Sequence, residues 1–404
     1  FNSLFYLPFI KYHLYHIGAL LIMAYSLSIL CIKIFERYNL KKYDELFFFK
    51  LLSFSFIIIF FYRLAEHGTD RSAQILSFIL ILEIIFFLKK EQISEKFFTK
   101  LFIIGSLAIS LKVFYLVYLI LLIPVIHFLY KEKKIIYLLE IIKNKFFYLS
   151  IIFLSFVTIV NFLNSGCLAY PLTVSCFENF SWSIPLDEVD RMRYHYENWS
   201  KSGAGPNFMV NDLHENIAYL NWLPGWIDRY FFTKVSDFLL GLLVMSLIFF
   251  FSFFSNKKKK TKQILNLNIL YIVLIILFIE WFYNHPALRY GGYHLIALLI
   301  FIPFALYLGS KVKFDKSLSL KINVILLIIL LVFAARNFHR ISKEIKLYNY
   351  DIFKNASYNK EFKNYEILNR ILEIKKCNLT ADSCGKETIK YKRFMNKDLF
   401  YKER

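Results

Sequence analysis

The sequence predicts an all-α integral membrane protein with about ten transmembrane helices and a large extracytoplasmic loop that carries interfacial helices. Hydrophobic residues make up 57% of its 404 residues, which leaves too little polar surface for a soluble protein of this length. Apolar runs such as 146–163 and 265–279 are almost uninterrupted and favour membrane spans. Lysines gather in the short connections between such runs, which is typical of cytoplasmic loops.

Ten apolar segments are expected to form the spans. Their approximate ranges are 13–35, 46–64, 72–88, 101–111, 113–130, 146–164, 235–254, 264–283, 293–309 and 320–336. The fourth and fifth flank Lys112 and could form one long tilted helix or a hairpin. A hairpin places every Lys-rich short loop on one side of the membrane, so we interpret the pair as a hairpin. Those loops are 36–45, 89–100, 131–145, 255–263 and 310–319.

The spans divide the chain into four segments. These are N-terminal helices 1–164, an extracytoplasmic loop 165–234, C-terminal helices 235–336 and an extracytoplasmic tail 337–404. The net charge of +20 lies largely in the Lys-rich loops rather than along one binding groove. No helix-turn-helix and no aromatic-basic platform for single strands stands out, so we expect no nucleic acid partner.

Four cysteines on the predicted outer side come in close pairs. Cys167 and Cys176 lie in the long loop, and Cys377 and Cys384 lie in the tail, whereas Cys31 is alone in an apolar helix. Each pair could close a small ring, and paired cysteines are typical of an oxidising compartment. We therefore expect two local disulfides, with four unpaired thiols as the alternative.

The long loop contains four of the five tryptophans. They are Trp182, Trp199, Trp222 and Trp226. Tryptophan prefers the boundary between membrane and water, so an interfacial belt is the first explanation, and stacking on a sugar ring, with Trp222 as candidate, is the second. Asp212 is a plausible N-cap, and 213–232 alternates apolar and polar residues as an interfacial amphipathic helix does, until Pro224-Gly225 interrupts it.

The first outer loop concentrates ionisable residues between two apolar spans. Glu66 lies four residues and His67 three residues before Asp70, so a helical turn would align each of them with Asp70. Such a group could act as a general base or as a carboxylate-histidine site for a divalent metal. The alternative is a solvated turn in which Asp70 caps the next helix.

The third outer loop, 284–294, follows Glu280 near the end of a span. Arg289 has a fixed charge and a planar fork that suits a phosphate oxygen, and His285 and His294 are placed to assist it. The alternative is an ion pair between Glu280 and Arg289 that shapes the loop. Lys112, at the tip of the predicted hairpin, is a further candidate to contact an anionic head group.

Three short segments carry a resemblance to known proteins. They read EHGTDRSAQIL at 66–76, NSGCLAYPL at 164–172 and NHPALRYGGYH at 284–294. Together with the many spans and the large outer loop, they resemble a family of polytopic bacterial membrane proteins related to the GT-C class of membrane glycosyltransferases. The resemblance implies transfer of a sugar from a polyprenyl-phosphate donor on the extracytoplasmic face of the inner membrane. Arg289 would hold the donor phosphate, and the partners would be membrane lipid and the lipid-linked sugar.

The resemblance also implies where the catalytic acid lies. GT-C enzymes usually carry it in the first outer loop, but here that loop is represented only by residues 1–12, which contain no acid. Because the chain starts at Phe1 without Met, we expect an N-terminal truncation, with Glu66 or Asp70 as second-loop acids. A lipid-linked polysaccharide polymerase or ligase is one alternative. A transporter or flippase is the other, although no internal repeat supports it.

Overall fold

The computed structural model describes most of the chain. The described residues are 17–63, 69–89, 95–180, 182–205, 213–254, 267–312, 316–348, 389–394 and 397–402. They form two compact units, 1–337 and 338–404, which are described separately.

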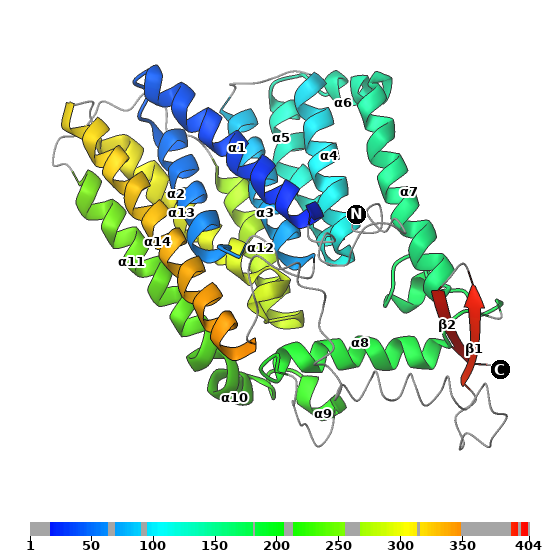
Figure 1. The fold of residues 1–404 in the computed structure, drawn as a ribbon. Helices are drawn as coiled ribbons and strands as arrows, with labels where there is room; N and C mark the ends of the chain where they lie inside the picture. Colours follow the sequence, from blue (N-terminus) through cyan, green and yellow to red (C-terminus); the bar gives the residue numbers. More distant parts are fainter. Residues whose placement is uncertain are drawn as a thin grey trace. The chain divides into compact units, whose positions relative to one another are not determined.

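The first unit is helical (Figure 1). Its first half comprises α1 (Ile17–Asn39), α2 (Glu45–Phe60), α3 (Asp70–Leu88), α4 (Glu95–Leu111), the 3-10 helix η3 (Val113–Leu121), α5 (Leu122–Lys131), α6 (Ile136–Glu140), η4 (Ile141–Lys143) and α7 (Lys145–Ser165). Its second half comprises η5 (Thr173–Ser175), α8 (Leu186–Lys201), α9 (Leu213–Ile217), α10 (Leu223–Trp226), the π-helix η6 (Ile227–Val235), α11 (Ser236–Phe253), α12 (Asn268–Asn284), η7 (Leu288–Tyr290), α13 (Gly292–Lys311) and most of α14 (Lys316–Tyr348). A helix therefore lies at each of the ten segments that the sequence predicted.

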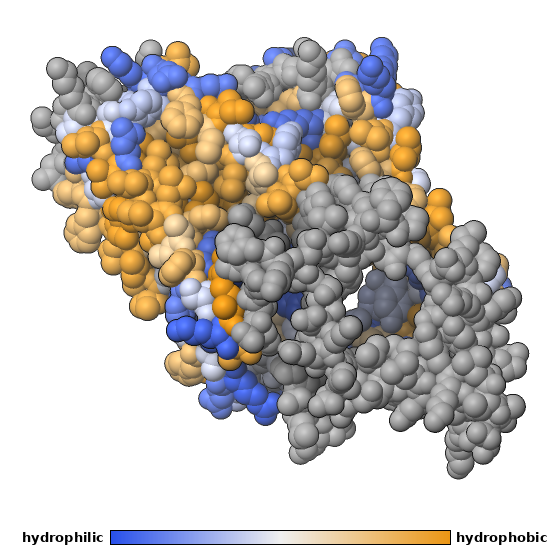
Figure 2. Space-filling model, viewed as in Figure 1, coloured by the Kyte–Doolittle hydropathy of each residue, from blue (hydrophilic) through white to orange (hydrophobic). Residues whose placement is uncertain are grey.

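The helices have the length and composition of a polytopic membrane protein. Among the described residues, seven helices are long and apolar enough to cross a membrane. They are Gly18–Asn39, Asp70–Leu88, Val113–Lys131, Lys145–Ser165, Leu223–Phe253, Gly292–Lys311 and Ser317–Leu347. Two shorter apolar helices cover Phe97–Leu111 and Asn268–Asn284. On the face drawn in Figure 2, apolar side chains form a band over the helices, with hydrophilic residues gathered above it and again below it. Ten membrane crossings remain a prediction.

The chain reverses direction at Lys112, as the sequence predicted. Lys112 has extended backbone angles between the end of α4 and the start of η3. The Phe87 ring near the end of α3 contacts Phe97 and Phe98 at the start of α4, and also Phe128 near the end of α5. Only an antiparallel pair brings these two ends to the same ring, so α4 and η3–α5 form a hairpin.

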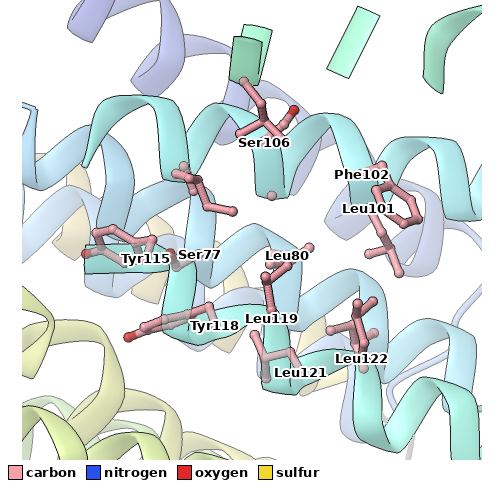
Figure 3. A pocket seen from close by; sticks show the side chains of 15 residues that line it. Ser77, Leu80, Leu101, Phe102, Ser106, Tyr115, Tyr118, Leu119, Leu121 and Leu122 are labelled. Atoms are coloured by element: carbon pink, nitrogen blue, oxygen red, sulfur yellow. The ribbon is translucent and has the colours of Figure 1, made fainter. Parts of the chain in front are cut away.

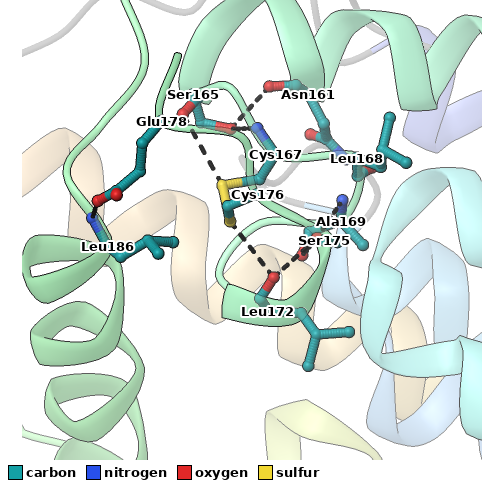
Figure 4. Close-up of a disulfide and its surroundings, with 10 residues drawn as sticks. All are labelled: Asn161, Ser165, Cys167, Leu168, Ala169, Leu172, Ser175, Cys176, Glu178 and Leu186. Atoms are coloured by element: carbon teal, nitrogen blue, oxygen red, sulfur yellow. Dashed lines mark hydrogen bonds between the residues drawn. A yellow bond between two sulfur atoms is a disulfide. The ribbon is translucent and has the colours of Figure 1, made fainter. Parts of the chain in front are cut away.

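The long loop begins with a small lobe closed by a disulfide between Cys167 and Cys176 (Figure 4). The turn before it uses Gly166, whose φ of 76° is a left-handed conformation that favours glycine. At the far side of the lobe, Glu178 Oε1 accepts a hydrogen bond of 2.9 Å from the Leu186 backbone N–H (Figure 4). A carboxylate at that position stabilises the start of α8, where Pro185 has no side-chain donor or acceptor to cap it.

The single interfacial helix predicted for 213–232 is wrong in detail. The structure divides this stretch into α9, a turn, α10 and η6, and the break lies between Ile217 and Leu223 rather than at Pro224-Gly225. Pro224 instead lies in the first turn of α10, where its missing N–H leaves no hydrogen bond unmade. The proposed N-cap Asp212 lies outside the described residues.

The second unit contains the end of α14 and a two-stranded antiparallel hairpin. Strand β1 (Ile389–Phe394) pairs with β2 (Lys397–Lys402), with Phe394 opposite Lys397. The sequence analysis predicted no strand in this tail. Cys377 and Cys384, the second predicted disulfide, lie outside the described residues.

Candidate functional site

Three segments far apart in the sequence meet at Asp70. This residue lies in the first turn of α3, and its side chain accepts hydrogen bonds from two cations. Lys112 Nζ, from the α4–η3 turn, bonds Asp70 Oδ1, and Arg289 Nε, from η7, bonds Oδ2 at 2.7 Å. The sequence left open whether Asp70 caps this helix. In the structure its carboxylate is turned towards the two cations instead. We call this end of the first unit the site end.

Arg289 is the partly exposed member of this group, with 55% of its side chain accessible. Its guanidinium carbon lies 5.4 Å from the ring centre of Trp199 and 5.7 Å from that of Tyr290. The following Gly291 has φ 147°, which a residue with a side chain rarely adopts. A Cβ atom on Gly292 would collide with the ring of Trp281. The two glycines thus let η7 turn tightly into α13 and present Arg289.

A buried chain of hydrogen bonds supports the backbone of Arg289. Gln74 Nε2 donates to the Arg289 carbonyl at 3.0 Å, so Gln74 Oε1 is an acceptor. His294 Nδ1 lies 3.3 Å from that oxygen, and Tyr118 Oη lies 2.7 Å from His294 Nε2. For a neutral imidazole, the consistent assignment donates from Nδ1 and accepts the Tyr118 hydroxyl proton at Nε2. Gln74, His294 and Tyr118 are all buried.

A groove of about 900 Å³ opens beside Arg289. Its volume lies in the range of small-molecule binding sites. Residues from α2, α3, α8, η6, α11, η7, α13 and α14 line it. Helix α14 forms one wall, tied to the rest of the unit by bonds from Arg336 Nη1 to the Ile59 carbonyl at 2.6 Å and from Asn337 Nδ2 to the Tyr62 carbonyl at 3.2 Å.

The groove is divided into a charged end and an apolar trough. Five cationic side chains line the charged end: Arg63, Arg71, Lys234, Arg289 and Arg336. The trough runs along two helices, with Leu240, Val244, Met245 and Ile248 on α11 and Ile325, Ile328, Ile329 and Val332 on α14. Asp237 and Phe249 mark its two ends on α11, about 18 Å apart along the helix axis. This arrangement has the polarity of a lipid with an anionic head.

Asp237 is the acid that lines the described part of this groove. It is exposed, in the first turn of α11. The sequence analysis missed it, because an acid in the first turn of an apolar helix is readily explained by the helix dipole. The other cations of the groove were missed as well, since each is readily explained as a charge flanking a span; they are Arg63, Arg71, Lys234 and Arg336.

Burial lowers the pKa values of two side chains near the site, Lys112 and His285. Burial lowers the pKa of the Lys112 ammonium to about 8, although the attraction of Asp70 opposes the shift. The ammonium also lies 3.8 Å from the ring centre of Tyr290. Burial, opposed by Glu197, lowers the pKa of the His285 imidazole to about 4. His285 is therefore neutral at pH 7, packed against Phe114 and Tyr290.

Several predicted site residues need correction. Trp222 is 1% exposed and His294 is fully buried, so neither can touch a ligand in the groove. His285, predicted to assist Arg289, packs its ring against Phe114 and Tyr290 and does not line the groove. Arg289 pairs with Asp70, whereas Glu280 accepts a bond from Asn284 at 3.2 Å.

Asp70 engages cations with both oxygens, which favours a positioning role over that of a base. Glu66 and His67 lie outside the described residues, so the proposed metal site is not tested. Within the described ranges, no group of three or more His, Cys, Asp or Glu could hold a metal ion. A divalent ion on Asp70 would have to displace Lys112 or Arg289.

A smaller cavity of about 110 Å³ lies between α3, α4 and η3–α5 (Figure 3). Tyr115, Ser77 and Tyr118 lie at one end of it, and Leu101 and Leu122 lie at the other. Its lining is almost entirely apolar. It does not include Arg289, so it is not a candidate for binding a phosphate.

Comparison with protein families gives one match. A family described as "Domain of unknown function (DUF8201)" matches residues 1–296. The chain belongs to this family. The DUF8201 match includes Asp70, Trp199, Asp237 and Arg289, but not the α14 wall of the groove. No curated protein and no solved structure matches the chain significantly.

Proposed function

We propose that the groove binds a lipid with a phosphate head group and that the protein transfers a sugar from a polyprenyl-phosphate donor. The observation that carries the proposal is the division of the groove into a cationic end at Arg289 and an apolar trough between α11 and α14. A water-soluble substrate would gain nothing from such a trough. An amphiphile places its phosphate among the arginines and its chain between the helices.

We infer that the charged end faces the extracytoplasmic side of the bacterial inner membrane, with about ten helices spanning it. Two features support this orientation. The Cys167–Cys176 disulfide belongs to the loop that delivers Trp199 to the site end, and disulfides persist in oxidising compartments. The Lys-rich short loops join the helices at their other ends, as the positive-inside rule requires.

In the proposed reaction, Arg289 binds the donor phosphate, assisted by the other cations of the groove. An acceptor hydroxyl attacks the anomeric carbon of the sugar and a new C–O bond forms. The bond between that carbon and the phosphate oxygen breaks, and the lipid phosphate leaves with the electron pair. Asp237 takes the hydroxyl proton, and Arg289 stabilises the charge that develops on the departing phosphate.

A lipid-linked polysaccharide polymerase or ligase is the second candidate. The lining favours it in one respect, because five cations accompany a single carboxylate in the described part of the groove. An enzyme of that kind would rely chiefly on Arg and His, without an essential acid. The role of Asp237 therefore distinguishes the two functions.

The test is transfer of a radiolabelled sugar from a polyprenyl-phosphate donor by the full chain reconstituted in lipid vesicles. Arg289→Ala should reduce turnover roughly ten- to a hundredfold, because it removes one charge-assisted contact. Asp237→Asn should reduce it about a hundredfold or more, as expected for loss of a general base.

Two matched variants serve as controls. Arg191, on α8, is 72% exposed and does not line the groove, and Asp228 is an exposed acid of η6 outside the lining. Arg191→Ala and Asp228→Asn should transfer normally. Normal transfer by folded Arg289→Ala overturns the phosphate assignment. Normal transfer by Asp237→Asn, with Arg289→Ala impaired, favours the polymerase or ligase.

A further inference from the structure

The aromatic wall of the groove next to Arg289 is Trp199. Its indole is partly exposed and lines the groove, whereas the predicted stacking residue Trp222 is buried. The guanidinium carbon of Arg289 lies 5.4 Å from the Trp199 ring centre. Tyr290 packs edge-on against the same indole, with ring centres 5.9 Å apart. Trp199 is thus an aromatic surface of the groove in direct contact with the proposed phosphate ligand Arg289.

The backbone that carries the indole is anchored on both sides of Trp199 by buried neighbours. Asn198 and Ser200 are fully buried, and Asn216 Nδ2 donates to Asn198 Oδ1 at 2.9 Å. Lys201, 1% exposed, pairs with Glu197 at 2.6 Å. A side chain between such anchors does not lose much conformational freedom when it binds a ligand.

The end of α8 is also locked in place. The Ala204 N–H donates to the Trp199 carbonyl at 2.8 Å, a bond of the type that closes helices ending in a left-handed residue. That residue is Gly203, with φ 99°, and a Cβ atom there would lie 2.8 Å from Arg229 Cβ. Glycine is therefore required at the position that fixes Trp199 at the end of its helix.

We propose that Trp199 stacks on the sugar ring of the lipid-linked donor and makes α8 a specificity element of the site; this inference rests on the proposed function. The sugar is bonded directly to the phosphate, so it must lie beside the group that binds the phosphate, which is Arg289. A pyranose whose C–H groups share one face packs well against an indole. The substrate class is therefore a lipid-linked pyranose, with its phosphate on Arg289 and its apolar ring face on Trp199.

The experiment measures binding to the full chain in lipid nanodiscs with two probes. One is a short-chain polyprenyl phosphate that carries a hexose, and the other is the same polyprenyl phosphate without sugar. Trp199→Ala should weaken the hexose form about five- to tenfold and leave the sugar-free form unchanged. Trp199→Phe should restore most of the binding, because it keeps an aromatic face. Trp182→Ala is the matched control, since Trp182 is exposed and stacks on Phe180 outside the groove lining.

Each other outcome has a definite meaning. Equal weakening of both probes by Trp199→Ala, or no weakening of either, overturns the stacking proposal while the lipid-phosphate function stands. Failure of the wild-type protein to bind either probe overturns the proposed function itself. Thermal unfolding of each variant, recorded in the same nanodiscs, identifies any variant that fails to fold. Should Trp199→Ala fail to fold, the comparison of Trp199→Phe with Trp199→Leu on the two probes decides the question by the same criterion.

Discussion

Arg289 donates a hydrogen bond from Nε to Asp70 Oδ2 at 2.7 Å, although 219 residues separate the two in the chain. Asp70 also binds Lys112 through its other oxygen. One carboxylate thus joins the start of α3, the α4–η3 turn and η7. Because Arg289 binds Asp70 through Nε, its two Nη atoms can donate to an anion in the groove.

The first prediction concerns Asp70→Asn. The substitution leaves the buried Lys112 ammonium beside Arg289 without its carboxylate, so the free energy of unfolding should fall by about 2–3 kcal/mol. Thermal and denaturant unfolding in detergent would measure the change. The double variant Asp70→Asn, Lys112→Met should recover part of the loss, because it removes the uncompensated charge. A double variant no more stable than Asp70→Asn alone would contradict this explanation.

The second prediction concerns the buried chain that supports Arg289. Gln74→Met keeps the volume of the side chain but loses the bond to the Arg289 carbonyl, so binding of a polyprenyl phosphate should weaken about fivefold to tenfold. In an Arg289→Ala background the same substitution should have no further effect, because the group it positions is gone. Equal effects in both backgrounds would show that Gln74 acts elsewhere.

Ser77→Ala is the matched control for Gln74. Ser77 is buried on the same helix, but its hydroxyl bonds only the Ala73 carbonyl of its own turn. We expect binding by this variant to equal that of the wild type.

The third prediction is a dependence of stability on pH. The pKa of His285 is about 4 in the folded protein, below the ordinary value of 6.5. Between these values the unfolded chain binds a proton that the folded protein does not, so stability falls as the pH drops from 6.5 towards 4. By pH 4, this effect should have lowered the free energy of unfolding by about 3 kcal/mol. His285→Gln should flatten the pH dependence of unfolding over that range, whereas an unchanged slope would exclude His285 as its source.

The fourth prediction is the orientation of the chain. Tyr219, in the long loop, is 83% exposed, and Lys258 belongs to a Lys-rich loop. In a background in which Cys31, Cys377 and Cys384 are replaced by Ser, a membrane-impermeant maleimide applied to intact cells should label Tyr219→Cys and spare Lys258→Cys. The native disulfide keeps Cys167 and Cys176 unreactive. Labelling in the opposite sense would reverse the proposed topology.

Many of the helices could be predicted from the sequence, because long apolar runs are typical of membrane spans. The reversal at Lys112 was predicted from the distribution of lysines, since only a hairpin places all the Lys-rich loops on one side of the membrane. The β-hairpin 389–402 and the division of 213–235 into three short helices could not be predicted. Short segments carry weak periodicity, and their structure depends on contacts with distant residues.

Arg289, Asp70 and Lys112 could each be singled out from the sequence, Arg289 because a charge beside two glycines is unusual in an apolar context, but their meeting could not be predicted. The partner of Arg289 could not be found in the same way, because nearby Glu280 is an equally plausible acid in sequence. Trp199 and Trp222 cannot be ranked without knowing which faces the groove, since burial is a tertiary property. Asp237 escaped notice for the same reason, because only the packing of α11 beside α14 gives it a groove to line.

The central claim is that a lipid phosphate lies with its chain in the trough between α11 and α14. Val244 and Leu247 are both exposed on α11, but Val244 lines the trough and Leu247 does not. The most direct measurement is binding of a short-chain polyprenyl phosphate to wild-type, Val244→Trp and Leu247→Trp proteins in nanodiscs. We predict that Val244→Trp fills the trough and weakens binding at least tenfold, while Leu247→Trp binds like the wild type. Equal binding by all three proteins would contradict the account.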